Sequence, residues 1–496
     1  MGITKESSNR KSTKLENSIP TTAITRSLTR QAFLVFFSAV FLPMFLAAVD
    51  QTILATATPS IVGDLGQLHL SSWIAIGYLL ATVASVPVYG WLGDRYGRRN
   101  ILICALIVFC LGSIIGAMAQ NMPQMIIGRV IQGLGGGGLM SLSQALIAEL
   151  IPPRERAKYQ GYFASMFACA SIGGPVIGGL VVTHYSWHWL FWANIPLALV
   201  AGWRLFSLTS KPNLEHRNKP IDWTGLLIFP ILCTLFLYWA SVGGQNFEWL
   251  SLSSAYFVFL IFVLSAVFYR NQRRHPTPFL PNELLKNRAI YIPLTTSMLF
   301  AACMFALIFF LPIYLQLGLK TNAATSGLLL LPLTAGQIFG ALCSGRIMAK
   351  TGIPKWIPVV GMSISTCGFI ALGTIPPEPT LVGLLGMLCG MGFGTVMPTT
   401  QLVIQTVGGK ANLGSVTALA SLCRNLGAAI GTALFGALIY TLLPGFDHNT
   451  SIEVLRNGPQ EPVIAAFQTS FYVAAGIAAL AALNAARAPI VVLGHE

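Results

Sequence analysis

The chain has 496 residues, of which 54% are hydrophobic and only 9% are charged, and its mean hydropathy is +0.69. A water-soluble fold of this length needs far more polar surface, so the composition excludes a soluble globular protein. The apolar residues lie in blocks of about 20, the length at which a helix crosses a ~30 Å hydrocarbon core. Because backbone groups in lipid must be satisfied within their own element, we expect an all-α polytopic membrane protein.

In chain order, the apolar blocks predict fourteen transmembrane helices. These spans cover residues 32–56, 71–92, 101–120, 124–148, 158–183, 188–208, 222–242, 250–269, 290–316, 325–347, 355–375, 379–404, 413–443 and 464–485. An even number of spans puts both termini on the same side of the membrane. Residues 1–31 are polar and basic and contain no apolar segment with a cleavage site, so the first span is expected to act as an uncleaved signal anchor.

The net charge of +14 is distributed unevenly along the chain. If the N-terminal tail is cytoplasmic, all of the 30 Lys and Arg residues lie in or next to cytoplasmic segments, except Lys320, Arg456, Arg129 and Arg424. This bias is what the positive-inside rule predicts. We therefore interpret the charge as a sign of membrane orientation, with both termini cytoplasmic, and not as a nucleic-acid-binding property.

Motifs of spans 1–6 recur in the same order in spans 9–14. "GDRYGRRN" begins at Gly93 after the second span, and "GRIMAKTGIPK" begins at Gly345 after the tenth. Such a parallel repeat is found in transporters built from two six-helix halves. The predicted domains are a cytoplasmic tail at 1–31, an N-terminal six-helix bundle at 32–208, a linker with two inserted transmembrane helices at 209–289, a C-terminal six-helix bundle at 290–485 and a cytoplasmic tail at 486–496.

Three charged residues lie deep within predicted spans: Asp50, Arg129 and Arg424. Each costs roughly 2.5–3.5 kcal/mol on insertion scales, so each needs a partner, a cavity or a function. A carboxylate whose surroundings alternate can load and release a proton, and we assign proton coupling to Asp50, with Arg129 as its partner. The alternative is a fixed structural pair. Arg424 is expected to hold the thirteenth span against its neighbours.

Small and polar residues form two stripes at helical spacing. The stripes are Arg129, Gly133, Gly136, Met140 and Gln144 on the fourth span, and Gly394, Pro398, Gln401 and Gln405 on the twelfth. We expect both faces to line a central substrate cavity, with Gln51 at its border and Gln132 among its residues. For each glutamine the alternative is an interhelical hydrogen bond.

Two further motifs are expected to act in conformational change. The turn "GWLGDRYGRRN" contributes Gly93, Asp94, Arg95, Gly97, Arg98 and Arg99, and "GGPVIGG" in the fifth span contributes Gly174, Pro175, Gly178 and Gly179. Asp94 can accept hydrogen bonds from a helix N-terminus of the other half, and the arginines can reach Glu149 or Glu155. The alternatives are a plain cytoplasmic anchor and simple helix packing. "GGGG" at 135–138 lacks the Lys-Ser/Thr of a phosphate loop and predicts close helix packing.

Together these motifs resemble those of the major facilitator superfamily, and specifically of its fourteen-helix drug:proton antiporters. The likeness rests on "AAVDQTILATATPSIVGDL", "GWLGDRYGRRN", "IGRVIQGLGGGG", "GGPVIGGL" and "SLCRNLGAAIGTAL", and it covers nearly the whole chain. It implies proton-coupled export of amphipathic drugs or toxic compounds by alternating access, with the contacts of the Asp94 turn holding the outward-facing state and breaking on inward opening. The alternatives are a same-fold exporter of one metabolite or siderophore, and a membrane channel or sensor.

The sequence shows no paired carboxylates, metal cluster or nucleophile triad, so we predict no enzymatic activity, no cofactor and no metal site. With Asp50 as the one deep carboxylate, the predicted substrate is a lipophilic small molecule that is neutral or carries a single positive charge. The other predicted partners are protons, the lipid bilayer and an envelope adaptor protein. Short loops and small tails are typical of a bacterial inner-membrane protein, and a fungal plasma membrane is the alternative location.

Overall fold

The computed structural model describes residues 30–67, 70–206, 220–243, 247–248, 250–279, 284, 286–321, 323–442 and 460–494, and these residues confirm the predicted all-α fold. The helices are α1 (Arg30–Leu65), α2 (Ser71–Tyr96), α3 (Arg98–Ala117), α4 (Met122–Leu150), α5 (Pro153–His184), α6 (His188–Trp192), α7 (Asn194–Phe206), α9 (Trp223–Val242), α10 (Leu252–Arg274), α12 (Arg288–Leu317), α13 (Ala323–Leu328), α14 (Leu331–Thr351), α15 (Trp356–Thr374), α16 (Pro379–Gly408), the short 3₁₀ helix η2 (Lys410–Asn412), α17 (Leu413–Leu442) and α19 (Gln460–Ala486).

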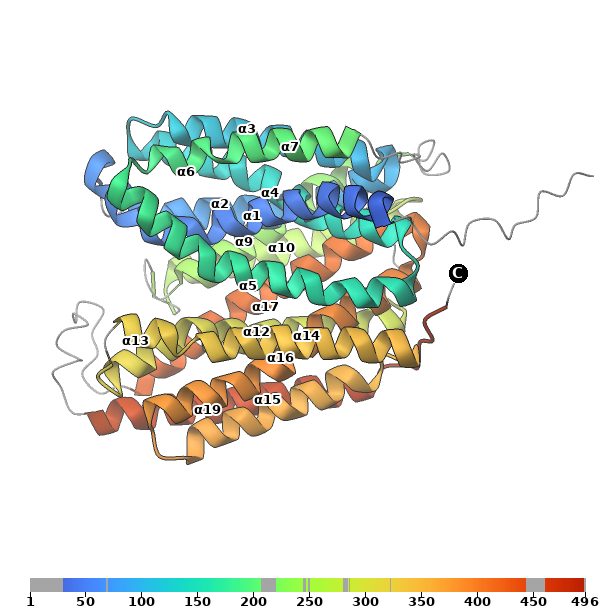
Figure 1. Ribbon diagram of the computed structural model, residues 1–496. Coiled ribbons are helices and arrows are strands. Elements are labelled where there is room, and N and C mark those ends of the chain that lie inside the picture. Colours follow the sequence, from blue (N-terminus) through green and yellow to red (C-terminus); the bar gives the residue numbers. More distant parts are fainter. Residues whose placement is uncertain are drawn as a thin grey trace, which may run out of the picture.

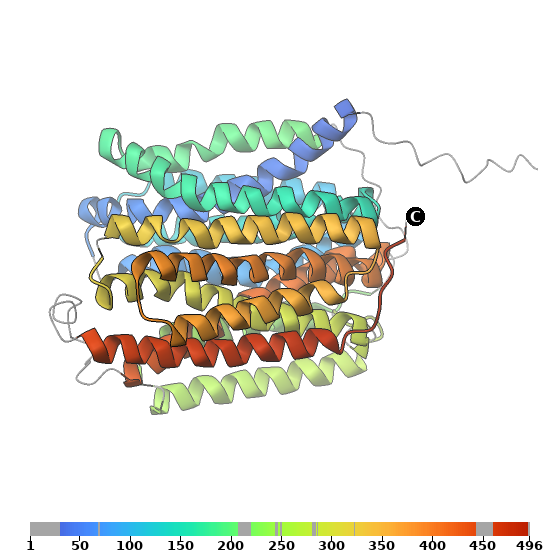
Figure 2. The same ribbon diagram turned by 60° about the horizontal axis from the view of Figure 1, so that its bottom comes forward.

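The helices run roughly along a common axis and form two groups (Figures 1 and 2). The first group comprises α1 to α7 and the second comprises α12 to α19, with α5 and α17 along the boundary (Figure 1). One end of the bundle holds the last described residues and the helix connections around Gly97, Pro152, Gly352 and Gly409. We call it the tail end.

The described helices account for most of the fourteen predicted membrane spans by length and hydropathy. Among the described residues, twelve helices are long and apolar enough to cross a membrane, and the bent α1 makes a thirteenth. The remaining predicted span corresponds to α5, which is 32 residues long. Charged residues in its first turns and a centre rich in Gly, Ala and Ser keep its hydropathy low. Helix α5 is therefore long enough to cross a membrane, but its hydropathy is too low for it to be counted among the apolar spans.

The two groups use the same pattern of helix contacts. In the first group α4 packs on α2 and α3, and α1 packs on α5 and α7. In the second, α16 packs on α14 and α15, and α12 packs on α17 and α19. Across the boundary, α5 packs on α14 and α2 packs on α17, which gives two equivalent seams between the groups. A parallel repeat predicts this correspondence of contacts.

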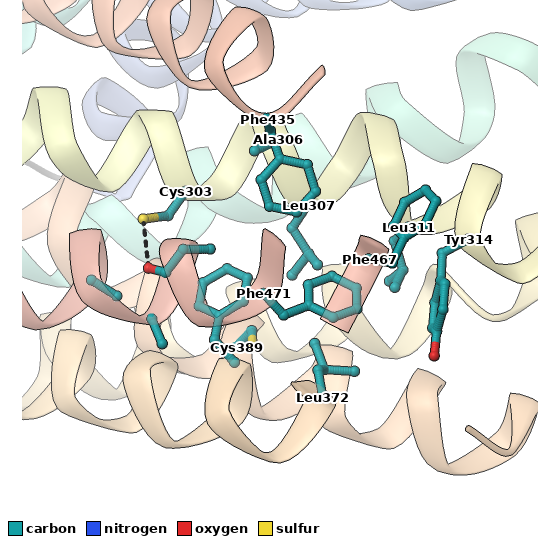
Figure 3. Packing of buried hydrophobic residues seen from close by; sticks show 14 of the residues in the cluster. Cys303, Ala306, Leu307, Leu311, Tyr314, Leu372, Cys389, Phe435, Phe467 and Phe471 are labelled. Carbon is teal, nitrogen blue, oxygen red and sulfur yellow. Dashed lines mark hydrogen bonds between the residues drawn. The ribbon is translucent and has the colours of Figure 1, made fainter. Parts of the chain in front are cut away.

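The interior of the second group is filled by aromatic and aliphatic side chains (Figure 3). The Tyr314 ring of α12 lies 5.1 Å from the Phe467 ring and 5.4 Å from the Phe471 ring of α19, between ring centres. Phe435 of α17 lies 6.1 Å from Phe471. Packed rings resist sliding because a small displacement loses many contacts at once. We expect α12, α17 and α19 to move together.

Helices α9 and α10 lie outside this pattern and cover one seam. Residues of α9 share a buried cluster with α2 and α17, including Phe229, Leu80 and Leu422. Asp222 caps α9 by accepting a hydrogen bond from the Gly225 amide, at 2.8 Å. The same carboxylate accepts bonds from Asn271 and Gln272 of α10, at 2.7 and 3.1 Å. The inserted helices are therefore fixed to each other and to the α2–α17 seam.

The connection between α2 and α3 is shorter than the segment 93–100 that the predicted spans leave between them. Helix α2 continues to Tyr96 and α3 begins at Arg98, so Gly97 alone joins them. Its φ angle is +95°, a conformation that glycine adopts without steric cost. The charges of the motif therefore lie on two helix ends, and their directions are set by helical geometry.

Helix α1 bends where α5 packs against it. The bend is 50° and falls between Leu54 and Thr56. Pro59 has no N–H to donate to the carbonyl of residue 55, so the bend coincides with a missing helical hydrogen bond. Close by, the Thr52 hydroxyl donates to the Ala170 carbonyl of α5, at 2.8 Å.

The glycines of "GGPVIGG" are not equivalent at this contact. A Cβ atom at Gly174 would overlap Thr52 Oγ1, and one at Gly178 would lie 2.5 Å from Thr56 Oγ1 and 2.7 Å from the Ile53 carbonyl oxygen. A Cβ at Gly179 would meet nothing within 4 Å. The close approach to α1 expected from the motif therefore involves Gly174 and Gly178 but not Gly179.

The C-terminal segment contacts both groups at the tail end. The Leu493 amide donates to the Gly352 carbonyl, at 2.9 Å. The Leu493 side chain is 2% exposed and belongs to a cluster with Ala157 of the first group and Met348 and Leu402 of the second. This segment therefore lies across the α5–α14 seam.

Gly178→Ala should lower the thermal unfolding midpoint of the detergent-solubilised protein, because the added methyl group enters a filled contact, at a cost of roughly 1–3 kcal/mol. Gly179→Ala is the matched control on the same helix. It should leave the midpoint unchanged or raise it, since alanine favours helix over glycine. Equal losses in both variants would contradict the assigned packing.

Leu493→Asp should loosen the tail end of the α5–α14 seam, because it removes a buried leucine worth roughly 1.5–3 kcal/mol and introduces a charge. The readout is the rate at which a water-soluble maleimide modifies cysteine in an Ala157→Cys variant whose native cysteines have been replaced. Val492→Asp is the control, since Val492 is 68% exposed. A modification rate that is the same in both variants would show that the tail does not close this seam.

Candidate functional site

A buried polar network surrounds Asp50 near the centre of α1. The side chain is 3% exposed, and its Oδ2 accepts a hydrogen bond from Arg129 Nη1 of α4, at 2.7 Å. Its Oδ1 accepts bonds from Gln132 Nε2, at 2.8 Å, and from Asn194 Nδ2 of α7, at 3.1 Å. A buried carboxylate is tolerated when an opposite charge and further donors satisfy its oxygens. The structure thus brings together the two residues to which the sequence analysis assigned proton coupling.

Arg129 is held from several sides as well. Its Nε donates to the Ile74 carbonyl of α2, at 3.1 Å, and its Nη1 also contacts Gln132 Oε1. The guanidinium carbon lies 4.2 Å from the centre of the Tyr78 ring, which is a cation–π distance. Arg129 therefore connects α1, α2 and α4, and a change at Asp50 reaches three helices.

Two members of this network, Ser113 and Asn194, were not singled out from the sequence. Ser113 of α3 accepts bonds from Gln132, at 2.8 Å, and from Asn194, at 3.3 Å. The available signal was a single polar residue in an otherwise apolar stretch, as in "IVFCLGSIIGA" and "FWANIP". Gln132, expected among the cavity residues, is fully buried behind Asp50. Gln51 is exposed at mid-helix, a position that a polar amide occupies in a cavity rather than in lipid.

A second polar cluster, the tail-end cluster, joins the two groups at the α2–α17 seam. The Asp94 carboxylate accepts hydrogen bonds from the Gly414 and Ser415 amides, both at 2.7 Å, and from the Ser415 hydroxyl, at 2.9 Å. These amides open α17, so a carboxylate at the end of α2 caps a helix of the other group. The unsatisfied amides and the positive end of the helix dipole both favour an anion there.

Arg98 completes the tail-end cluster. Its Nη2 lies 2.6 Å from Asp94 Oδ1, and its Nη1 lies 2.7 Å from Glu149 Oε2 at the end of α4. The same Nη2 donates to the Lys410 carbonyl of η2, at 2.9 Å. Of the two carboxylates anticipated for the arginines of this motif, Glu149 is therefore in contact, whereas Glu155 lies exposed at the start of α5.

Two other arginines of the motif have contacts within the first group. Arg95 lies over the Trp91 and Tyr96 rings, at 5.4 and 5.8 Å. Arg99 donates to the Leu205 and Phe206 carbonyls at the end of α7, at 2.8 and 3.0 Å. Arg99 therefore connects α3 to the end of α7 within the first group.

Glycines allow the backbones to touch at the α2–α17 crossing. A Cβ at Gly90 would lie 2.6 Å from both the Gly414 carbonyl oxygen and the Ala418 Cβ. Gly93 packs against Leu142 of α4 instead. Gly90 was not singled out from the sequence, because nothing in its own motif points to a partner more than 300 residues away.

The α5–α14 seam carries a charge contact of the opposite sign. Arg154 donates to the Ala349 and Lys350 carbonyls at the end of α14, at 2.9 and 3.0 Å. A cation is favourable at this negative end of a helix. One seam thus has a carboxylate on a helix N-terminus and the other an arginine on a helix C-terminus.

Arg156 extends this contact toward the centre of the molecule. It is 3% exposed, and its Nη1 donates to Gln405 Oε1 of α16, at 2.7 Å. Gln405 Nε2 in turn donates to Thr417 Oγ1 of α17, at 3.0 Å, and lies 3.5 Å from the Gln144 carbonyl of α4. The sequence analysis had placed Arg156 in a connecting loop.

The residues expected to line a cavity are mostly covered in this conformation. Gln144, Gln401 and Gln405 are buried, and Met140 is partly buried. The predicted stripe glycines Gly133 and Gly136 lie against Tyr78 of α2, and Gly135 and Gly138 lie against α3, so "GGGG" packs α4 between two neighbours as expected. Similarly, Gly394 lies against α14. The glycines therefore serve helix packing, and the glutamines lie where the two groups meet.

Arg424 lies on α17, apart from the Asp50 network. Its Nη2 makes a long hydrogen bond of 3.3 Å to the hydroxyl of Ser421, on its own helix. Among the described residues no carboxylate oxygen lies within 4.0 Å of its guanidinium, and its side chain is partly exposed. The contact with neighbouring helices expected from the sequence is therefore not visible as a hydrogen bond to another helix.

Relatives and solved structures agree with this architecture. A multidrug transporter protein, MdtP, of Bacillus subtilis is 32% identical over 408 residues, which cover 81% of this chain and 74% of that protein. An MFS-type efflux pump, LUC4, of a Fusarium species is 30% identical over 442 residues, or 86% of this chain and 78% of that pump. The crystal structure of the human organic anion transporter MFSD10 has a TM-score of 0.65 over 91% of this chain and 99% of its own; at 16% identity it shows the fold alone.

The family profile described as Major Facilitator Superfamily matches residues 40–432, which include both polar clusters and most of each helix group. Relatives at about 30% identity over most of their length point to the same family. Its members are transporters and not enzymes. This chain belongs to the major facilitator superfamily.

Proposed function

We propose that this protein exports amphipathic small molecules from the cytoplasm in exchange for protons, by alternating access. The observation that carries the proposal is the buried Asp50–Arg129 pair, an ionisable pair in the middle of a bundle with Gln51 exposed beside it. Intramembrane ionisable residues mark proton and substrate pathways. The names of the relatives, a multidrug transporter and an efflux pump, support export as the direction.

The membrane placement follows from the charges and from α5. We infer fourteen spans, with α5 as a span because its 32 residues lie between α1 and α14 inside the bundle. The excess of Lys and Arg near the tail end supports a cytoplasmic location of that end and of both termini. The predicted location is the cell membrane, as in a bacterial inner-membrane protein.

With this orientation, the described conformation is closed toward the cytoplasm. The contacts of Asp94 and Arg98 close the α2–α17 seam, and those of Arg154 and Arg156 close the α5–α14 seam. All of them lie at or near the tail end. Opening toward the cytoplasm requires them to break, so we assign Asp94 and Arg98 a gating role.

Coupling follows from the Asp50 network. Protonation of Asp50 removes the negative charge that faces Arg129, Gln132 and Asn194, so the relative positions of α1, α4 and α7 depend on the proton. A ligand shifts a conformational equilibrium only through its differential binding to the two states. A proton-motive force of ~180 mV supplies roughly 4 kcal/mol per proton, which supports about a thousandfold gradient of a neutral substrate.

Two alternative functions predict different transport behaviour. A same-fold exporter of one metabolite or siderophore would keep the proton site and accept a single ligand. A channel or sensor would show no dependence on a pH gradient. The extensive contact between groups at the tail end favours an alternating transporter over an open pore.

Asp50→Asn should abolish proton-driven dye efflux in inverted membrane vesicles and leave dye exchange without a gradient intact, because the amide keeps a hydrogen-bonding group but cannot carry the proton. Asp64→Asn is the control, since Asp64 lies on the same helix and contacts only Trp187 in the described network. Loss of a buried ion-pair partner costs roughly 3–5 kcal/mol, so the double variant Asp50→Asn/Arg129→Gln is measured as well. Retained coupling in both Asp50 variants would remove Asp50 from the mechanism.

Asp94→Ala should shift the population toward the cytoplasm-open state, since three hydrogen bonds across the seam are lost, each worth about 1.5–3 kcal/mol because the acceptor is charged. Pulsed EPR between spin labels at Glu155 and Lys350, in a background without native cysteines, should report longer distances. Asp222→Ala is the matched control, because Asp222 caps a helix without joining the two groups. A longer distance in both variants would indicate general loosening instead.

A further inference from the structure

The depth of Arg424 places its charge near the middle of the membrane. It follows Leu413, the first residue of α17 at the tail end, by eleven positions. At 1.5 Å per residue this is about 16 Å along the helix, or half of a ~30 Å hydrocarbon core. A cation at this depth requires a partner, a cavity or a ligand.

The face that carries Arg424 is turned toward the boundary between the groups. Thr417, Ser421 and Arg424 follow one another at helical spacing, so they share one face of α17. Thr417 on this face accepts a hydrogen bond from Gln405 of α16, and Gln405 also approaches α4. The face therefore looks toward α16 and α4, between the two groups.

This face of α17 and the neighbouring part of α16 have more hydrogen-bond donors than the described residues have acceptors for them. A guanidinium has five N–H donors, and Arg424 uses one, in the long bond to Ser421. Gln401 lies one turn from Gln405 on α16; its Nε2 is buried and has no acceptor within the described part of the chain. Arg156 donates to Gln405, one turn from Gln401, and so pairs with an amide rather than with a carboxylate. By helical position, Arg424 and Gln401 both lie farther from the tail end than the hydrogen bond between Thr417 and Gln405, and neither has a carboxylate partner among the described residues.

The buried carboxylates near this region already have hydrogen-bond or ion-pair partners. Both Asp50 oxygens are occupied by Arg129, Gln132 and Asn194. Asp94 and Glu149 are bound in the tail-end cluster. A cationic substrate would therefore find no unpaired carboxylate in the described interior, whereas an anionic one would find unpaired arginine. The predicted neutral or singly positive substrate depended on Asp50 as the one deep carboxylate, and in the structure this carboxylate is paired with Arg129.

From this arrangement we propose that Arg424, assisted by the Gln401 amide, binds the acidic group of an amphipathic organic anion, such as a carboxylate or sulfonate, during export. The inference rests on the proposed export function and names its substrate class. Arginine suits this role because its planar fork can donate two parallel hydrogen bonds to such a group.

The substrate charge has an electrical consequence. When one anion leaves and one proton enters, two charges move in the same electrical sense, so the exchange is driven by membrane potential. Exchange of a single cation for one proton moves no net charge. The response of efflux to membrane potential at constant pH gradient therefore separates the two substrate classes.

The test uses two probes with the same aromatic skeleton, the anionic 1-anilinonaphthalene-8-sulfonate and the neutral N-phenyl-1-naphthylamine, in proteoliposomes of the full chain. The wild type should export the sulfonate faster when an inside-negative potential is imposed. Arg424→Gln should weaken sulfonate binding on the order of tenfold to a hundredfold, the range for a charge-assisted bond, and leave the neutral probe unchanged. Arg424→Lys should retain part of the sulfonate binding.

A second variant guards against misfolding of the first. Ser421→Asp puts a carboxylate three residues from Arg424 on the same face, so it should compete with the sulfonate while keeping the arginine in place. Unchanged sulfonate binding in Arg424→Gln or in Ser421→Asp, or equal losses for both probes, would overturn the inference. So would a wild type that exports the neutral probe but not the sulfonate. Failure to move either probe or the cation ethidium would instead count against the export function itself.

Discussion

The rest of the structure depends on one constraint: a charge within the membrane-spanning part of the protein needs a partner, a cavity or a ligand. Asp50 meets this constraint with three donors from α4 and α7, and Arg129 meets it with a carbonyl of α2 and the Tyr78 ring. Four helices are therefore positioned by a single pair of charges. The arrangement connects the helices of the first group through one ion pair and its hydrogen bonds.

At the seams between the groups, charged side chains also have partners within the protein, and across each seam these partners include the backbone groups at helix ends. At one seam a carboxylate lies on the first amides of α17; at the other an arginine lies on the last carbonyls of α14. Both contacts use backbone groups that any helix leaves unsatisfied at its ends. They therefore require little besides close approach, which Gly90 and Gly414 permit at the first seam. Such contacts can form and break without unfolding either helix.

The sequence predicted those site residues whose types rarely occur within membrane spans. Asp50 and Arg129 stood out because charges within spans are costly, and Glu149 was anticipated as a partner because it follows a span directly. Ser113 and Asn194 did not stand out, since single serines and asparagines also occur as isolated interhelical donors. Gln132 donates to Asp50 and Ser113, which is the interhelical hydrogen bonding kept as the alternative for each glutamine.

Connections were the least predictable part of the fold. Hydropathy ends a span where charge begins, so it could not show that α2 continues through Asp94 to Tyr96 or that Gly97 alone forms the turn. It also missed that Arg156, read as a loop residue, lies buried against Gln405. The parallel repeat was easier to see, because small-residue motifs recur at corresponding places and the same helix pairs then meet.

The inserted helices break the equivalence of the two seams. Residues of α9 pack with α2 and α17, whereas no helix in the described part of the chain packs across α5 and α14 from outside. With the protein in a bilayer, one seam is shielded from acyl chains and the other borders them. The two halves of an internally repeated protein thus present unlike sides to the membrane.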